Sequence, residues 1–588
     1  MTLWVVAGAL IATICALAWV AVRGAIAADL LRSARGQALE VVANVDDPAA
    51  VSELITGLAA DTGTAHALTS DVTWQAVEQL PWIGPQLHAI STIAASADAV
   101  AVDALTPLAE VASTLPADAF RPIDGRISLD GFVAVQNAAA RAADSIGGAA
   151  EAIEFANSPA LIGPLADVVD QVSDLFTETA HATDALARAS VLIPAMLGQD
   201  EPRDYLVIFQ NNAEWRSLGG IAGALAVVHT DDGGLILTEQ DYAANIGSFV
   251  PPVLDLDPEL TAVYGVRPAT WMHNVTQVPD FEVSGQLAQA MWADRHATQV
   301  DGVIALDPVA LSYILEATGP VELPTGDTLT AGNAVELLLN EVYVRYPDPE
   351  QQNQFFSDTT SAIFQALTQR GFNAGTLLAG LARAGDEYRV MLWSAHDEDQ
   401  AVLADTTLAG APLETTRRTT PFGVYLNDGT GSKMDYYQSV ETTALWEACT
   451  LDAAGAASGT AVLEVTIANE APASGLAEYI TGGGAYGVEP GSASTVGYLY
   501  LPEGFELADA TLTTGDGFGG GFIDGRQVLS FEILLAPGES ATARVAVRTT
   551  EPSGAQLAVR QTPTVNRDVT PETGSCLLGP LDSNQGAP

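Results

Sequence analysis

The sequence predicts a multidomain α+β protein with an N-terminal transmembrane helix, a helical stalk or bundle, a central α/β domain and a C-terminal β-sandwich. Three observations predict this class: a charge-free apolar run near the start, helical spacing of apolar residues to about residue 195, and strand patterns after Asp204. The predicted boundaries are 1–28 for the anchor, 29–198 for the helices, 199–434 for the central domain, 435–576 for the sandwich and 577–588 for a disordered tail.

The anchor is predicted from residues 3–22, which read LWVVAGALIATICALAWVAV. A run of about 20 uncharged residues is long enough to cross a hydrocarbon core of ~30 Å. Ala25-Ile26-Ala27 resembles a signal-peptidase site, so cleavage remains an alternative, although a helical pattern that continues past Arg23 favours an uncleaved anchor. Basic residues follow the run and none precedes it, which by charge alone would place the bulk of the chain in the cytoplasm. A basic leader upstream of Met1 would reverse that orientation.

Composition bounds the partners. The formal net charge is −50, so the surface repels nucleic acid and anionic lipid headgroups, and membrane contact is expected through the apolar helix. Cys449 and Cys576 are a plausible disulfide pair in an exported protein, with two buried free thiols as the alternative. The bridge would contribute up to ~4–5 kcal/mol in the chain-entropy model. The sequence has no CxxC motif or Cys/His cluster, so we expect no metal site.

Apolar periodicity places the individual elements. Helices fill residues 29–195, with a Pro-containing break at 81–85. In the central domain we expect strands at 204–209, 223–229 and 300–306, and helices at 309–317, 329–344 and 355–368. In the sandwich we expect strands at 460–468, 495–501, 527–533 and 540–549.

Standard catalytic signatures are missing from the sequence: it has no GxSxG, HExxH or Walker A motif, and no catalytic residue is assigned. A GxGxxG match at Gly515, Gly517 and Gly520 lies between two predicted strands and indicates a glycine-rich hairpin.

One polar segment, residues 210–220 (QNNAEWRSLGG), directly follows a predicted strand. Ligands of α/β sheets bind outside the carboxyl ends of strands, so this segment is a candidate site for a polar or phosphorylated ligand. A hydrogen-bonded structural loop is the alternative. The candidate ligand-binding residues in it are Gln210, Asn211, Asn212, Glu214 and Arg216.

Four segments carry a family resemblance: YLVIFQNNAEWRSLGGIAGALAVV at 205–228, VDGVIALDPVALSYILEATGPVEL at 300–323, VYLNDGTGSKMDYY at 424–437 and LPWIGPQL at 80–87. They resemble a family of bacterial envelope proteins, domain of unknown function 4012, over nearly the whole chain. The resemblance implies the layout already described and no established reaction. Together with the cysteines, it favours a single-pass protein of the cell membrane with its ectodomain outside the cytoplasm.

The central domain is also similar, more distantly, to LytR-CpsA-Psr proteins, which transfer glycopolymers from polyprenyl pyrophosphate carriers to the cell wall. Segment 300–323, followed by LTAGNA at 329–334 and VYVRY at 342–346, carries this similarity. The similarity implies arginines that grip a pyrophosphate and acidic residues that hold magnesium. Arg345 and Arg216 stand at matching places, whereas Pro347 replaces the second arginine of the family's YxRxR pattern.

Three functions compete. The first is an envelope factor without a clear catalytic site that binds a polyprenyl-linked or cell-wall glycan during surface polysaccharide assembly. If this function is correct, Arg216, Arg345 and segment 210–220 lie around one pocket that has an apolar tunnel. The second is a glycopolymer phosphotransferase, the one case in which a cofactor, magnesium, is expected, with Asp307 or Glu214 as the acids. The third is a structural or adhesive surface protein whose protein partners are unknown.

Overall fold

The computed structural model describes residues 2–44, 48–114, 125–157, 160–370, 372–452, 455–484, 487–566 and 570–576, with the backbone alone for 2–15. The predicted disordered tail at 577–588 lies outside the described residues. The chain forms two compact units. The helical unit comprises residues 1–121 and 127–201, and the sheet unit comprises residues 122–126 and 202–588. A multidomain α+β protein with a helical N-terminal region is thereby confirmed.

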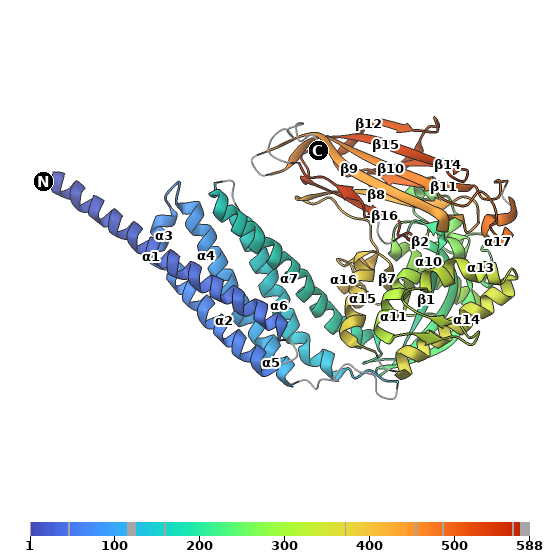
Figure 1. Cartoon of the computed structure of the whole chain (residues 1–588), viewed down its shortest axis with the longest axis horizontal. Helices are drawn as coiled ribbons and strands as arrows, with labels where there is room; N and C mark the ends of the chain where they lie inside the picture. Colours follow the sequence, from blue (N-terminus) through green and yellow to red (C-terminus); the bar gives the residue numbers. More distant parts are fainter. Residues whose placement is uncertain are drawn as a thin grey trace. The chain divides into compact units, whose positions relative to one another are not determined.

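The helical unit consists of long helices joined by short connections. They are α1 (Thr2–Ala43), α2 (Pro48–Thr69), α3 (Val72–Glu78), α4 (Gly84–Ala99), the π-helical η1 (Val100–Leu105), α5 (Thr106–Thr114), α6 (Asp130–Ala156) and α7 (Gly163–Met196). α6 and α7 lie side by side, as do α1 and α2 (Figure 1). Ala27, Ala65 and Ala94 meet where α1, α2 and α4 pack, because a methyl side chain lets helix axes approach closely.

One helical stretch, Gly84–Val111, is long and apolar enough to cross a membrane by length and composition. Several of its side chains are nevertheless buried against other helices of the unit, among them Leu87, Ile93 and Ala104. That packing accounts for its apolar composition, so this stretch is only weak support for membrane anchoring. α1 runs unbroken through Arg23 to Ala43, past the predicted end of the anchor at residue 28.

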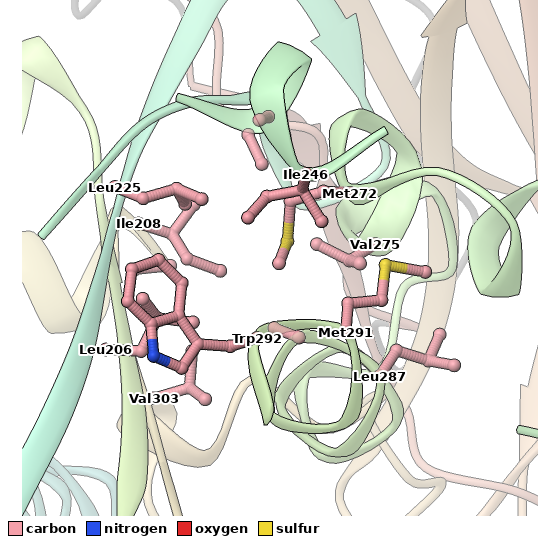
Figure 2. Packing of buried hydrophobic residues seen from close by; sticks show 14 of the residues in the cluster. Leu206, Ile208, Leu225, Ile246, Met272, Val275, Leu287, Met291, Trp292 and Val303 are labelled. Atoms are coloured by element: carbon pink, nitrogen blue, oxygen red, sulfur yellow. The ribbon is translucent and has the colours of Figure 1, made fainter. Parts of the chain in front are cut away.

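The sheet unit begins with a mixed five-stranded sheet in the order β3-β2-β1-β4-β7. Its strands are β1 (Arg203–Arg216), β2 (Gly219–Asp231), β3 (Gly234–Tyr242), β4 (Gly302–Leu306) and β7 (Val390–Ser394). Only the β1–β4 pair is parallel. Helix α10 (Phe281–His296) covers one face, where Trp292 lies beside Leu206 and Met291 lies near Val275 in one buried cluster (Figure 2).

Further helices complete this part of the unit. They are α8 (Ala243–Ile246), α9 (Pro258–Tyr264), η2 (Arg267–Ala269), η3 (Met272–Gln277), α11 (Pro308–Thr318), α12 (Ala334–Glu336), η4 (Leu337–Glu341), α13 (Val342–Arg345), α14 (Pro349–Gln365), η5 (Ala366–Arg370), α15 (Ala374–Asp386), α16 (Asp397–Leu403) and η6 (Thr407–Ala409). The spacing of apolar residues predicted α11, α14 and a helix over the 334–345 region, but it did not predict α10 or α15. β5 (Val321–Glu322) and β6 (Thr328–Leu329) form a small hairpin.

Segment 210–220 is not a loop, which corrects the prediction. β1 continues to Arg216 and pairs with β2 as far as Gly219, with register shifts after Phe209 and between Asn211 and Trp215. Gly220 makes this close pairing possible, because a Cβ there would lie 2.2 Å from the carbonyl carbon of Asn211. The polar composition of segment 210–220 therefore belongs to an irregular strand pair and not to a loop.

Two five-stranded sheets, β12-β15-β10-β9-β17 and β13-β14-β11-β8-β16, enclose one apolar core. Their strands are β8 (Thr419–Asp428), β9 (Gln438–Leu451), β10 (Ala457–Asn469), β11 (Ala493–Tyr500), β12 (Phe505–Leu512), β13 (Gly519–Ile523), β14 (Arg526–Leu535), β15 (Ser540–Thr549), β16 (Gln556–Gln561) and β17 (Glu572–Thr573). The short η7 (Met434–Tyr437), α17 (Glu478–Thr481) and η8 (Gly482–Gly484) connect them.

The sandwich and the central sheet belong to one compact unit. Trp215, at the end of β1, is fully buried in the core between the sandwich sheets, and β8 precedes the expected boundary at residue 435. The predicted disulfide is present between Cys449 and Cys576, whose Cα atoms are 5.9 Å apart. Gly515 and Gly517 lie between β12 and β13, and Gly520 lies in β13. The predicted glycine-rich hairpin is wrong, because β12 and β13 belong to different sheets and the segment crosses from one sandwich sheet to the other.

Candidate functional site

A cavity of about 850 Å³ opens in the sheet unit on the face of β1 opposite α10. Phe209 and Asn211 reach it because side chains alternate along a strand, and Leu206 and Ile208 point the other way into the core. The remaining walls come from β2, the start of α11, η4, α14 and the turn that follows β8. The cavity is therefore assembled from segments as distant in sequence as Phe209 and Tyr479.

One wall of the cavity is apolar. Leu306 and Leu311 come from the β4–α11 junction, and Leu338 and Leu339 come from the π-helical turn η4. Phe356 and Ile363 add the inner face of α14. This wall can bury hydrocarbon, at about 25 cal/mol for each Å² of apolar surface removed from water.

A polar part of the cavity lining comes from β1. Asn211 donates from Nδ2 to the hydroxyl of Tyr343 at 2.5 Å. Arg216 is held by Asn274, which accepts from Nε at 3.1 Å, and by the carbonyl of Trp215. Gln210 accepts from the backbone N–H of Gly220 through Oε1, while its buried Nε2 has no hydrogen-bond partner among the described residues. A buried amide of this kind favours a ligand that can accept a hydrogen bond.

The most charged part of the cavity surrounds Lys433, the single lysine of the chain. Its Nζ forms an ion pair with Glu214 and lies 5.0 Å from the ring centroid of Tyr343 and 5.8 Å from that of Tyr479. Burial lowers the pKa of Lys433 to about 7, whereas Asp435 nearby raises it. The amine can therefore exchange a proton near neutral pH.

Two further buried carboxylates lie beside Lys433. Asp435 accepts from the backbone N–H of Trp215 at 2.6 Å, and burial and the neighbouring Asp428 raise its pKa well above the usual range. Asp428 accepts from Thr430 and from the N–H of Gly431, and burial raises its pKa as well. These two acids therefore hold protons at pH values where exposed aspartates are ionised.

The cavity also carries cationic and aromatic groups that can meet an anionic or sugar-bearing ligand. Arg267 is exposed and has no carboxylate partner in the described part of the sheet unit. Burial, followed by the charge of Arg216, lowers the pKa of His273, so this imidazole is neutral at pH 7. Tyr242, Trp271 and Tyr479 add flat aromatic surfaces to the same cavity.

The structure brings together four of the six predicted ligand-binding residues, Gln210, Asn211, Glu214 and Arg216. Asn212 is fully buried instead and donates to Asp307 and to the carbonyl of Pro563, both at 3.0 Å. Arg345 is not among the cavity residues, because it is paired with Asp327 at 2.7 Å and with Glu341. The expected pocket with Arg216 and Arg345 on its wall is therefore not formed.

The two acids nominated for magnesium are already paired with cations. Asp307 caps α11, accepting from the N–H of Ala310, and forms a buried ion pair with Arg389 at 2.7 Å. Glu214 is paired with Lys433. Within the described ranges, no group of three or more His, Cys, Asp or Glu side chains is arranged to hold a metal ion.

The sequence reading missed Lys433, Asp428, Arg267, Tyr343 and Tyr479 as site residues. One signal was available: Asp428 and Lys433 both lie in the 424–437 segment that carried the family resemblance. Lys433 is also the single lysine in a chain whose other Lys/Arg residues are all arginines, and this rarity was a second available signal.

Comparison with known proteins gives a family and no activity. No curated protein matches the chain. Residues 200–343, which contain β1 to β4, α11 and the η4 wall of the cavity, match the model of a family described as "Protein of unknown function (DUF4012)". The match supports the predicted family over residues 200–343, which include the resembling segments 205–228 and 300–323 but not those at 80–87 and 424–437.

Proposed function

We propose that the sheet unit binds an amphipathic glycan ligand, of the lipid-linked or cell-wall kind, in an extracytoplasmic step of surface polysaccharide or envelope assembly. The observation that carries this proposal is the mixed lining of the cavity, which combines leucines with amide, arginine and lysine groups. A polyprenyl chain matches the leucines, and a phosphate or sugar head matches the polar groups. Arg345 takes no part in the proposed binding site, because it does not line the cavity.

The proposal includes the location of the protein. In it, the apolar run at residues 3–22 anchors the chain in the cell membrane as a single pass, and the rest lies outside the cytoplasm. The Cys449–Cys576 bridge supports this location, because disulfides persist in oxidising compartments. The finer assignment of the central sheet as LytR-CpsA-Psr-like belongs to the same proposal.

Binding rather than transfer is the function that the geometry supports better. A phosphotransferase like the LytR-CpsA-Psr enzymes needs several arginines around a pyrophosphate and carboxylates that are available to bind magnesium. Here Arg345 is held away from the cavity by Asp327 and Glu341, and both nominated acids are neutralised by Arg389 and Lys433. A purely structural or adhesive role gives no reason for a cavity of about 850 Å³ with buried charges.

The test is mass spectrometry of lipids and glycans that co-purify with the detergent-extracted full chain. We expect a polyprenyl-linked or wall glycan to be retained by the wild type. Ala224→Trp, which places an indole inside the cavity, should lose it, and Arg267→Gln should reduce it. The matched control is Arg345→Gln, which removes an arginine outside the cavity and should retain the ligand.

If Ala224→Trp retains as much lipid or glycan as the wild type, the cavity is not the binding site. Loss in Arg345→Gln with retention in Arg267→Gln would instead restore the arrangement that the sequence suggested. If the wild type carries no lipid or glycan, the adhesive alternative becomes the better account.

A further inference from the structure

Large exposed apolar side chains gather at one end of the helical unit. The exposed fraction is 82% for Val72, 90% for Trp82 and 87% for Phe155, and Leu80, Ile83 and Ile162 are exposed as well. They lie in or beside the connections α2–α3, α3–α4 and α6–α7. Soluble proteins seldom expose contiguous apolar groups of this size, so such a patch indicates a surface that another phase or partner covers.

Hydrogen bonds hold these connections at the same end. The Gln86 amide, at the start of α4, donates to the carbonyl of Ala160 at 2.7 Å and accepts from the N–H of Ile162 at 3.0 Å. Below them, Ala89 and Ile153 share one buried cluster. We call this end, residues 70–86 and the ends of the α6–α7 connection at 153–157 and 160–163, the apolar tip.

The apolar tip is also where the charge-free run of α1 ends. Arg23, its first charged residue, pairs with Asp71 at 2.9 Å and donates to the carbonyls of Ala67 and Leu68. Val20 packs with Trp74, Val77 and Leu87, and Ala16 and Leu17 pack against the same cluster. Ala16 lies ~10 Å before Arg23 along the helix axis at 1.5 Å per residue.

We propose that the apolar tip inserts shallowly into the lipid bilayer beside α1. This rests on the proposed anchoring of residues 3–22. If that run is in the bilayer and Arg23 marks its boundary, α3 and the first turns of α4, which pack with residues 16–20, lie at interfacial depth together with the turn that joins them. Trp is enriched at that depth, and amphipathic elements bury ~5–10 Å of their apolar face there.

The charged groups near the apolar tip indicate which lipid headgroups it can bind. Arg23 is paired with Asp71, and Glu78 accepts from Trp74 Nε1 and from Ser91. Other ionisable groups beside the connections are His88, Glu154 and Asp170, which accepts from the Asn157 amide at 2.6 Å. Without a basic cluster in the described tip, binding depends on apolar burial, so zwitterionic lipid is sufficient and anionic headgroups add nothing.

The test uses the full chain in phosphatidylcholine vesicles, with one nitroxide label at a time. Labels at Trp82→Cys and Phe155→Cys, in a Cys15→Ser background, should collide more with oxygen than with a water-soluble nickel complex. Matched controls are Leu39→Cys and Val133→Cys, exposed apolar positions away from the tip, which should show the reverse ratio. Leu39 lies ~24 Å beyond Arg23 on α1.

A label on native Cys15 reports the anchor itself. If Cys15 is in lipid while positions 82 and 155 behave like position 39, the tip inference is wrong and the anchor stands. If Cys15 is also in water, both are wrong. Dipolar broadening between copies at position 82, with no oxygen preference, would mean that a second copy covers the tip, and it would overturn lipid insertion.

Discussion

The two units differ in the polar groups that they bury. The buried polar residues described in the helical unit are hydroxyls, Thr62, Thr69, Ser96, Ser173, Thr183 and Ser190. Several of them donate back to their own helix, as Thr62 does to Leu58 and Thr183 to Thr179. The sheet unit instead buries ionisable residues, Arg203, Glu214, Asp307, Arg389, Asp399, Lys433, Asp435, Arg526 and Arg560. A buried charge is costly to desolvate, so the sheet unit has to offset this cost with ion pairs or with bound protons.

The buried charges of the sheet unit are themselves of two kinds. Arg203–Asp399 at 2.9 Å and Arg389–Asp307 at 2.7 Å are close ion pairs that join β1 or β4 to later elements. Around Lys433, by contrast, Glu214, Asp428 and Asp435 outnumber the buried cations, and protonation of the aspartates relieves the excess. The first kind stabilises the fold, and the second is a property of the cavity.

The largest expected difference between the units comes from removing one paired arginine from each; in the sheet unit, Arg389 is paired with both Asp307 and Glu387. Arg389→Met leaves Asp307 buried without its cation, and we expect a loss of about 3–5 kcal/mol in the sheet unit. Arg32→Met removes the exposed Arg32–Asp29 pair of the helical unit and should cost at most ~1 kcal/mol. Hydrogen exchange of the full chain, followed by mass spectrometry, reads the two units separately. Equal effects of the two variants would erase the proposed distinction.

The next effect is confined to the sheet unit. Replacing both Cys449 and Cys576 by Ala opens a bridge with a sequence separation of 127 residues, and we expect a loss of about 2–5 kcal/mol. Exchange should accelerate in β9 and in the strands that pair with it, while the peptides of α6 and α7 keep their wild-type protection. Acceleration in α6 and α7 as well would show that the units unfold together.

The fold was predictable where the signal is local. Helices at 29–195 and the strands β10, β11, β14 and β15 follow from periods of 3.6 and 2 in the sequence. The union of the central sheet with the sandwich was not predictable, since it depends on Trp215 crossing into a core built by strands two hundred residues later. β3 was missed because it is half-exposed along its length, and β7 because it is only five residues long. α10 was missed because its buried face includes Ser284, Gly285 and Ala288, which weaken the apolar period.

The site was predictable only along one strand. Gln210, Asn211, Glu214 and Arg216 were found because their polarity interrupts an apolar run. Arg345 was chosen through a family pattern, which carries no information on the acids at Asp327 and Glu341 that hold it. Lys433 and Tyr479 reach the cavity through long-range packing, which a single sequence does not encode as a visible pattern.

The smallest expected effect concerns the proton on Lys433. Its pKa of about 7 in the fold lies below the ~10.4 of an exposed lysine, so the unfolded chain binds more protons between these values. Stability therefore rises with pH from about 7 to 9, by up to ~1.4 kcal/mol per pH unit. The double variant Glu214→Gln/Lys433→Met removes the amine without leaving its partner charged, and keeps Asp428 and Asp435. It should lose this rise when exchange protection of the sheet unit is measured from pH 7 to 9 and corrected for the intrinsic rate. A rise that persists in the variant would mean that another group titrates, and that Lys433 stays charged in its pair with Glu214.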